Sequence, residues 1–257
     1  MALPRVIPVL LLRNKGLVKT VKFAEHKYIG DPVNAVKVFN EKDVDELCFL
    51  DIDASREGRE PPFRYLEQIA SECFMPLSYG GAVRSVEQIR KLIQSGIEKI
   101  IINTQALENP EFVRSACDTF GSSTIVGAMD VKQNFWGKYH IYVHTKRTML
   151  AVEPVEYAGT LQQLGVGEIL VNSVDHDGMM NGYDINLVSR ISQAIDVPLI
   201  ACGGCGSIDD IHRVINEGGA SAAAAGSFFV FHGKHRAVLI TYPEYHQLST
   251  FFDSRKT

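Results

Sequence analysis

A chain of 257 residues with 46% hydrophobic and 22% charged residues has the composition of a globular protein with a sizeable core. Its formal net charge of −4 argues against a nucleic-acid partner, and no apolar run is long enough to cross a bilayer. Because no export signal precedes the first apolar run, we expect a cytoplasmic protein whose five cysteines are reduced.

Short apolar runs bounded by Gly, Asp or Asn recur along the chain, and such runs are typical of buried strands. The predicted strands cover residues 6–12, 47–52, 76–79, 99–103, 124–129, 168–172, 198–201 and 221–225. Between them, apolar residues at helical spacing predict helices, most clearly at residues 85–95 and 209–217. This alternation predicts an α/β protein, either a closed (β/α)8 TIM barrel or a doubly wound open sheet.

The two halves of the chain repeat each other. The segment Pro76-Leu77-Ser78-Tyr79-Gly80-Gly81 resembles Pro198-Leu199-Ile200-Ala201-Cys202-Gly203-Gly204, which begins 122 residues later. A half-length repeat favours the barrel over the open sheet. We therefore expect one domain over residues 1–257, with half-barrels at about 1–122 and 123–245 and a C-terminal tail at 246–257.

Two glycine pairs, Gly80-Gly81 and Gly203-Gly204, each follow a predicted strand and precede a helix. Glycines there let the backbone approach an anion, and the start of a helix supplies free N–H groups. Asn103-Thr104 and Gly226-Ser227 follow the next strand of each half. The pattern predicts two phosphate cradles that face each other and hence a phosphorylated small-molecule ligand. The alternative is that the glycines only form tight turns.

Asp130 ends the fifth predicted strand, at the level where barrels carry out chemistry. The repeat aligns the segment that ends at Asp130 with Ile7-Pro8-Val9-Leu10-Leu11. The counterpart of Asp130 is therefore Leu11. Paired acid and base catalysis needs two ionisable groups, and the chain supplies one of them.

Four predicted strands begin with a charge in the inward register, namely Arg5, Glu46, Lys99 and Glu168. Unpaired inward charges are very costly, but two cations and two anions can neutralise one another as a ring. The inward residues above them are mainly apolar or small. The pattern predicts a polar ring that closes a narrow apolar passage. The alternative is that the charges reach solvent and form ordinary surface pairs.

These features, together with Phe49-Leu50-Asp51-Ile52, Ser173-Val174-Asp175-His176-Asp177-Gly178 and Gly182-Tyr183-Asp184, resemble the cyclase subunit of imidazole glycerol phosphate synthase. The resemblance spans nearly the whole chain. It implies a (β/α)8 barrel that binds a separate glutaminase subunit on its N-terminal face. It also implies that ammonia passes up the barrel to a bisphosphorylated ribulose substrate, without a cofactor or a metal.

The resemblance also implies roles for individual residues. The charged ring would be the ammonia gate, Asp130 would be one of two catalytic aspartates, and Lys19 matches a lysine of the mobile first loop. The family's phosphate contacts match Gly81, Asn103, Thr104, Gly204 and Ser227, with Asp177 nearby.

The chain departs from this family at three places. Leu11 stands where the family has its other catalytic aspartate, and general acid–base help is typically worth ~10²–10⁴-fold in rate. Ala82 replaces a third glycine, and residues 228–236 differ from the usual cyclase. These departures resemble a divergent branch associated with surface-polysaccharide (lipopolysaccharide O-antigen) synthesis. In that branch the barrel and its glutaminase supply ammonia to a third enzyme that amidates a sugar.

Three functions therefore stay open. The first is an ammonia-conducting barrel that serves such an amidating enzyme. The second is a working cyclase of histidine biosynthesis, in which Asp130 acts alone or with Lys19 to form imidazole glycerol phosphate and aminoimidazole carboxamide ribotide. The third is a non-enzymatic sensor of phosphorylated sugars. The sister isomerase of the same pathway is disfavoured, because it needs two carboxylates and has no use for a gate.

Overall fold

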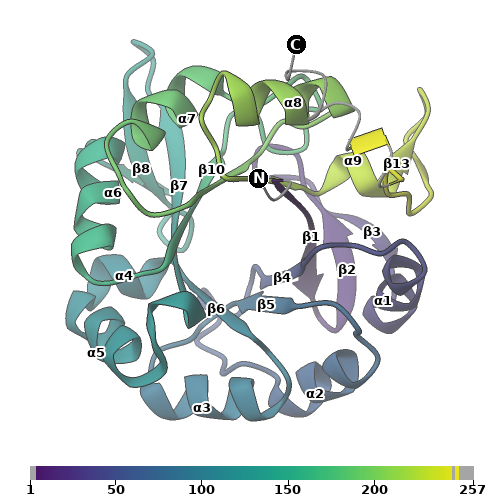
Figure 1. Cartoon of the computed structure of the whole chain (residues 1–257), viewed down its shortest axis with the longest axis horizontal. Helices are drawn as coiled ribbons and strands as arrows, with labels where there is room; N and C mark the ends of the chain where they lie inside the picture. The colour runs from purple at the N-terminus through teal and green to yellow at the C-terminus, as the bar shows by residue number, and fades with distance from the viewer. Residues whose placement is uncertain (1–3, 245–246, 249–257) are drawn as a thin grey trace.

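A closed barrel of eight parallel strands forms the centre of the computed structural model, which describes residues 4–244 and 247–248 (Figure 1). Pairing of β7 with β10 and of β12 with β1 closes the barrel. The strands are β1 (Arg5–Arg13), β4 (Leu47–Asp51), β5 (Leu77–Gly80), β6 (Lys99–Ile102), β7 (Ile125–Gln133), β10 (Glu168–Ser173), β11 (Leu199–Cys202) and β12 (Ala222–Ala225). The predicted (β/α)8 barrel is confirmed, and the open sheet is wrong. Most of the tail expected at residues 246–257 lies outside the described residues.

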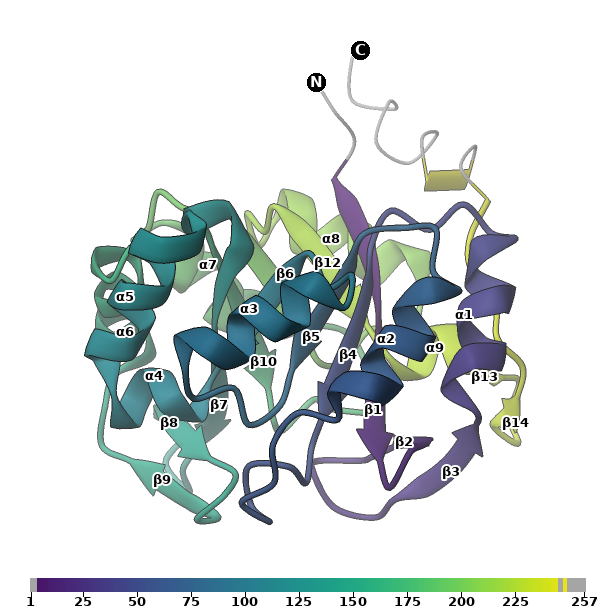
Figure 2. The same cartoon turned by 90° about the horizontal axis from the view of Figure 1, so that it is seen from below.

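Helices cover the outside of the barrel (Figures 1 and 2). They are α1 (Pro32–Asn40), α2 (Phe63–Ser71), α3 (Val86–Gln94), α4 (Thr104–Glu108), α5 (Pro110–Phe120), α6 (Pro154–Gln163), α7 (Ile185–Ser192), α8 (Ile208–Asn216) and α9 (Ser227–Val230), with a 3-10 turn, η1 (Ser122–Thr124). The repeat extends to the helix caps, since the side chains of Ser85 and Ser207 accept backbone N–H groups at the starts of α3 and α8. Within the described part of the chain, no helix is long and apolar enough to span a membrane.

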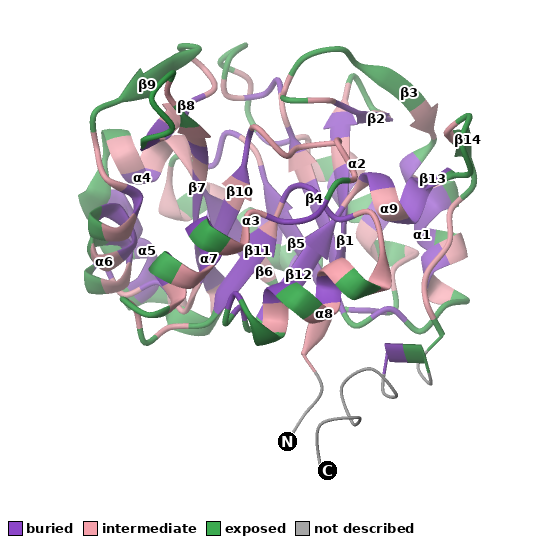
Figure 3. Cartoon of the chain, turned by 90° about the horizontal axis from the view of Figure 1, so that it is seen from above, coloured by how far each residue is buried: buried purple, intermediate pink, exposed green. Residues whose placement is uncertain are grey.

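An antiparallel extension follows the first strand of each half. β1 leads into β2 (Gly16–Lys19) and β3 (Lys27–Gly30), and β7 leads into β8 (Tyr139–Val143) and β9 (Thr148–Leu150). We call residues 16–30 the first arm and residues 131–152 the second arm. Both lie at the carboxyl ends of the barrel strands, which we call the top of the barrel and which point downward in Figure 2 and upward in Figure 3. A short hairpin of β13 (Phe231–His232) and β14 (Ala237–Val238) follows the last barrel strand.

The barrel strands bury both of their faces, whereas exposed residues gather on the helices and arms (Figure 3). In β1, Val6 and Leu10 pack outward against the helices, while Ile7 and Val9 belong to a separate cluster inside the barrel. The residues of β1 therefore alternate between outward and inward positions, and Arg5 belongs to the inward set from which the charged ring was predicted.

Candidate functional site

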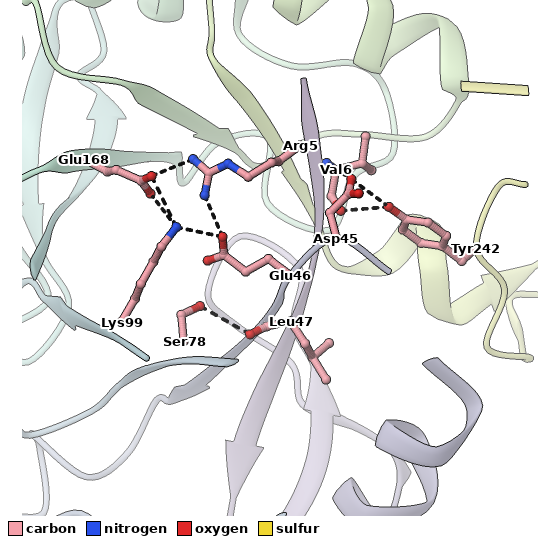
Figure 4. Close-up of polar contacts among 9 residues, drawn as sticks. All are labelled: Arg5, Val6, Asp45, Glu46, Leu47, Ser78, Lys99, Glu168 and Tyr242. Carbon is pink, nitrogen blue, oxygen red and sulfur yellow. Dashed lines mark hydrogen bonds and ion pairs between the residues drawn. The ribbon is translucent and has the colours of Figure 1, made fainter. Parts of the chain in front are cut away.

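The four charged residues at the floor of the barrel, the end where its strands begin, form a closed ring of ion pairs (Figure 4). Arg5 Nη1 lies 2.6 Å from Glu46, and Arg5 Nη2 lies 2.7 Å from Glu168. Lys99 Nζ lies 2.9 Å from Glu46 and 3.2 Å from Glu168. Each cation therefore contacts both anions. The predicted inward direction of these side chains is confirmed, and the alternative of separate surface pairs is wrong.

The ring is neutral overall and partly shielded from water. The side chain of Glu46 is 4% exposed, whereas that of Arg5 is 29% exposed. Burial alone would lower the pKa of Arg5, but Glu168 and Glu46 together raise it above its ordinary value. The two glutamates of the ring therefore keep Arg5 charged despite its partial burial.

Backbone contacts hold the start of β1, and with it Arg5, in place. Val6 N donates to Asp45 Oδ2 at 3.1 Å, and the hydroxyl of Tyr242 donates to Val6 O at 3.0 Å (Figure 4). Tyr242 lies 236 residues from Val6 in the chain, so the sequence offered no local signal for this contact.

Above the ring the barrel interior is apolar. Its lining comes from alternate residues of seven strands: Ile7, Val9, Cys48, Ile101, Val126, Ala128, Leu170, Ile200, Ala222 and Ala224. Ser78 of β5 is buried beside this lining, and its hydroxyl donates a hydrogen bond to Leu47 O at 3.3 Å. Such a lining accommodates a small neutral molecule at far lower cost than an ion.

A cavity of about 180 Å³ lies at the top of the barrel. All the residues predicted for the upper site line this one cavity: Leu11, Lys19, Gly80, Gly81, Asn103, Thr104, Asp130, Asp177, Gly203, Gly204, Gly226 and Ser227. The structure therefore brings together what the sequence spread over both halves.

Asp130 lies half-buried in the wall of this cavity. Asn103 Nδ2 donates to one carboxylate oxygen at 2.9 Å, and Asn172 Nδ2 donates to the other at 3.5 Å. Burial raises the pKa of Asp130 to about 7, against the lowering effect of these two hydrogen bonds. Asp130 can therefore hold or release a proton near neutrality. Leu11 lines the same cavity and offers no second proton-transfer group.

Lys19 ends β2 and folds into the barrel rather than out to solvent. Its ammonium group donates to Val9 O, and a Cβ on Gly226 would overlap with Lys19 Nζ. Burial lowers the pKa of Lys19 to about 8, although Asp177 acts in the opposite direction. Gly226, which the sequence assigned to a phosphate cradle, therefore also makes room for this lysine.

Asp177 holds the segment between β2 and β3 across the cavity. Its Oδ2 accepts from Thr20 Oγ1 at 2.8 Å and from Phe23 N at 3.2 Å. The ring of Phe23 then lies edge-on to that of His144 in the second arm, with centroids 5.5 Å apart. The two arms thus meet over the cavity, and Asp177 positions the first arm as well as lining the predicted phosphate region.

The two glycine pairs are not equivalent. Gly204 has φ +107, and a Cβ there would overlap with the carbonyl of Gly182. Ala82, its counterpart in the repeat, has φ +54 and fits, with its N–H donating to Ser55 Oγ at 3.2 Å. The second turn therefore requires glycine on steric grounds, whereas the first tolerates alanine.

Sequence reasoning missed an ionic network beside the cavity. Asp51 lines the cavity and lies 3.2 Å from Arg59, and Asp53 bonds to Arg13 at 2.8 Å and to Arg56 at 2.7 Å. The available signal was the run Asp51-Ile52-Asp53 at a strand end, followed closely by two arginines.

Comparison with known proteins gives a consistent result. Residues 5–236 match the histidine biosynthesis protein family. The chain is 50% identical over 244 residues to a Pseudomonas aeruginosa protein named provisionally as imidazole glycerol phosphate synthase subunit hisF2, covering 95% of this chain and 97% of that one. It is 48% identical over 240 residues (93% and 92%) to a Vibrio vulnificus protein named provisionally as subunit hisF3. It is 43% identical over 225 residues (88% and 89%) to the imidazole glycerol phosphate synthase subunit HisF of Alkaliphilus metalliredigens.

Proposed function

This chain belongs to the histidine biosynthesis protein family, and from that premise we propose that it is the ammonia-conducting barrel of a glutamine amidotransferase complex rather than an efficient cyclase. One observation carries the proposal: a complete ionic ring at the floor coexists with Leu11 as the counterpart of Asp130 at the top. The ring serves the passage of a small molecule. Leu11 removes the second proton-transfer group that the cyclase reaction would use.

At the floor, the ring acts as the ammonia gate. Its four charges exclude ions by already being paired, and the apolar lining above favours neutral ammonia over ammonium. The ammonia comes from a separate glutaminase subunit that binds the N-terminal face. An interface there is supported by Phe74, which is 85% exposed in the loop before β5. The loops before β4 and β6 expose acidic residues at the same end of the barrel, among them Glu41, Asp43 and Glu98, with Lys42 between the first two.

At the top, the glycine turns and the residues opening α4 and α9 bind a phosphorylated small molecule. The cyclase reaction is slow there, because loss of one member of an acid–base pair typically costs ~10²–10⁴-fold in rate. Ammonia that reaches the cavity is instead passed to a third, amidating enzyme that modifies a sugar for surface-polysaccharide synthesis in the cytoplasm. This assignment is supported by the resemblance to the divergent branch, through Leu11 and Ala82.

A working cyclase is the second candidate, and the ionisation of two cavity residues favours it. The pKa of Asp130 is about 7 and that of Lys19 is about 8, so both groups exchange protons near neutrality. Lys19 Nζ is, however, committed to Val9 O in this structure.

The deciding experiment supplies the bisphosphorylated ribulose substrate with free ammonium, without a glutaminase, and measures formation of imidazole glycerol phosphate. The Alkaliphilus metalliredigens subunit serves as the positive control. We expect turnover at least about 100-fold slower than that control. Equal turnover would establish a cyclase and defeat the proposal. Slow turnover together with failure to bind or stimulate any glutaminase would defeat both candidates and favour a sensor of phosphorylated sugars.

A further inference from the structure

The second arm, residues 131–152, concentrates positive charge in a chain whose net charge is −4. It contains four cationic residues, Lys132, Lys138, Lys146 and Arg147, and no aspartate or glutamate. Lys138, Lys146 and Arg147 are exposed, and the ion pair of Lys146 with Glu108 of α4 is 3.1 Å long. The arm therefore presents a basic surface at the top of the barrel, in contrast to the acidic residues of the floor.

The turn between β7 and β8 exposes two aromatic side chains. Phe135 is 95% exposed and Trp136 is 85% exposed, and their rings stand perpendicular with centroids 6.0 Å apart. The side chain of Asn134 fixes this turn by accepting from Trp136 N at 3.0 Å and from Lys138 N at 2.9 Å. A rigid turn that leaves two large aromatic rings in solvent adds nothing to the core and is typical of a binding site.

The other end of the same arm borders the cavity. Tyr142, Val143, His144 and Thr145 line it, and the buried atoms His144 Nδ1 and Thr145 Oγ1 have no hydrogen-bond partner among residues 4–244 and 247–248. The hydroxyl of Tyr139 anchors the arm by donating to Asp184 at the start of α7, 2.9 Å away. The arm thus runs as one fixed surface from the mouth of the cavity to the outer rim, and a protein bound to it would lie against the mouth.

We propose that the second arm is the docking surface for the protein that consumes the ammonia, and that Phe135 and Trp136 insert into an apolar pocket of this partner rimmed by acidic residues. This inference rests on the proposed function. Neutral ammonia that leaves an open cavity is lost to water, so the acceptor has to cover the mouth. Aromatic anchors surrounded by cations fit an acidic partner surface. A bilayer or a nucleic acid also suits aromatic and basic residues, but neither one consumes ammonia at this mouth.

The opposite charges of the floor and the second arm would direct the glutaminase and the ammonia-consuming enzyme to different ends of the barrel. The glutaminase meets an acidic floor with Phe74, whereas the acceptor meets a basic arm with Trp136. Like-charge contacts disfavour the exchanged arrangement.

The partner can be trapped in the cells that produce this protein. Photo-reactive benzoylphenylalanine is placed at position 136 in the full chain and, as the matched control, at position 74 on the floor. Position 136 is expected to crosslink to an enzyme that forms C–N bonds from ammonia, and position 74 to the glutaminase. A glutaminase crosslink at position 74 without any partner at position 136 overturns this inference and leaves the proposed function standing. No glutaminase crosslink at position 74 counts against the proposed function itself.

The decisive measurement is the rate of amidation by the purified partner, with the barrel and the glutaminase at limiting concentration. The double variant Phe135→Ser/Trp136→Ser is expected to lower glutamine-dependent amidation about 30-fold, in line with loss of a central aromatic anchor. Amidation driven by free ammonium should stay unchanged, and Tyr28→Ser on the first arm should change neither rate more than about threefold. An unchanged glutamine-dependent rate in the double variant overturns the inference.

Fluorescence separates the other occupants, because Trp136 is the only tryptophan of the chain. Its emission should shift to shorter wavelength on addition of the partner. A shift of the same size with vesicles of phosphatidylglycerol and phosphatidylethanolamine, with single-stranded DNA, or on raising the concentration of this chain alone would overturn the inference in favour of a bilayer, a nucleic acid or a second copy.

Discussion

The floor and the top of the barrel differ in how their ionisable groups are partnered. At the floor, Arg5 and Lys99 each contact both Glu46 and Glu168. At the top, Asp130 keeps its amide donors but has Leu11 as its counterpart.

The contrast teaches that passage and catalysis tolerate substitution differently. In a closed ring, loss of any one member leaves a partly buried charge without its partner and destabilises the fold. The need for a stable fold is therefore enough to keep all four residues. Replacement of a catalytic carboxylate by leucine in an apolar cavity removes a buried charge and leaves the fold intact. Under the proposed function, an ammonia conduit can therefore be kept while one of the catalytic groups above it is lost.

The largest effect is expected from restoring the missing carboxylate. Leu11→Asp should raise the rate of cyclisation with free ammonium by ~10²–10⁴-fold, because a second proton-transfer group is regained. Leu11→Asn is the matched control, since it has the size and polarity of aspartate but transfers no proton. Steady-state formation of imidazole glycerol phosphate measures the effect, and equal rates for the two variants would refute the comparison.

Breaking the floor ring should cost stability rather than chemistry. Glu46→Gln leaves Arg5 and Lys99 to share Glu168, and we expect the free energy of unfolding to fall by about 3 kcal/mol, at the lower end for a broken buried pair because Arg5 is partly exposed. Glu98→Gln, an exposed neighbour of the ring on the same face, should change it by less than about 0.5 kcal/mol. Urea unfolding measures both values, and similar losses would show that the ring is no more than a surface pair.

The raised pKa of Asp130 at the top of the barrel should be visible in the pH dependence of stability. The pKa of Asp130 in the folded chain, about 7, lies above its ordinary value of 3.8, so the folded state binds this proton more tightly than the unfolded state. The contribution of Asp130 to stability is therefore full below about pH 4 and is lost as the pH rises to about 7.

Asp130→Asn cannot ionise, so this variant should not lose stability as the pH rises from 4 to 7. The variant should be more stable than the parent above pH 7, by on the order of 4 kcal/mol for a shift from 3.8 to about 7, and the difference should vanish near pH 4. Thermal unfolding from pH 4 to pH 8 measures it. A difference that stays constant with pH would show that Asp130 does not titrate in this range.

The smallest effect is expected at the first glycine turn. Ala82→Gly relieves a left-handed alanine, worth about 1 kcal/mol, but gives the unfolded chain more freedom, worth 0.4–1 kcal/mol in the other direction. The net change in unfolding free energy should stay below about 0.5 kcal/mol. Gly204→Ala should cost several times more, because its Cβ meets the carbonyl of Gly182. Equal costs at the two positions would mean that the turns are equivalent after all.

The barrel and the ring were accessible from sequence because both depend on local periodicity. Seven of the predicted strands end within one residue of those observed, and the inward register followed from simple alternation in β1. The prediction for β7 ended at residue 129, whereas the strand continues to Gln133. The arms were missed because they are built onto the extended ends of two barrel strands. β2 pairs antiparallel with the end of β1 and β8 with the end of β7, and this pairing depends on where those ends project.

Contacts between distant segments were also beyond sequence reasoning. Asp177 was placed near a phosphate, but nothing local showed that it would hold Thr20 and Phe23 across the cavity. Lys19 was matched to a mobile loop, yet it ends a strand and enters the barrel, which is possible because Gly226 has no side chain.

Isotope transfer in the Leu11→Asp variant tests the central claim most directly. The variant and its glutaminase are given glutamine labelled with ¹⁵N in its amide, together with excess unlabelled ammonium and the bisphosphorylated substrate. An intact conduit below a repaired site predicts imidazole glycerol phosphate that carries mainly ¹⁵N, while the parent chain makes almost no product. Product labelled only to the level of the bulk ammonium pool, or rapid turnover by the parent chain, would contradict this account.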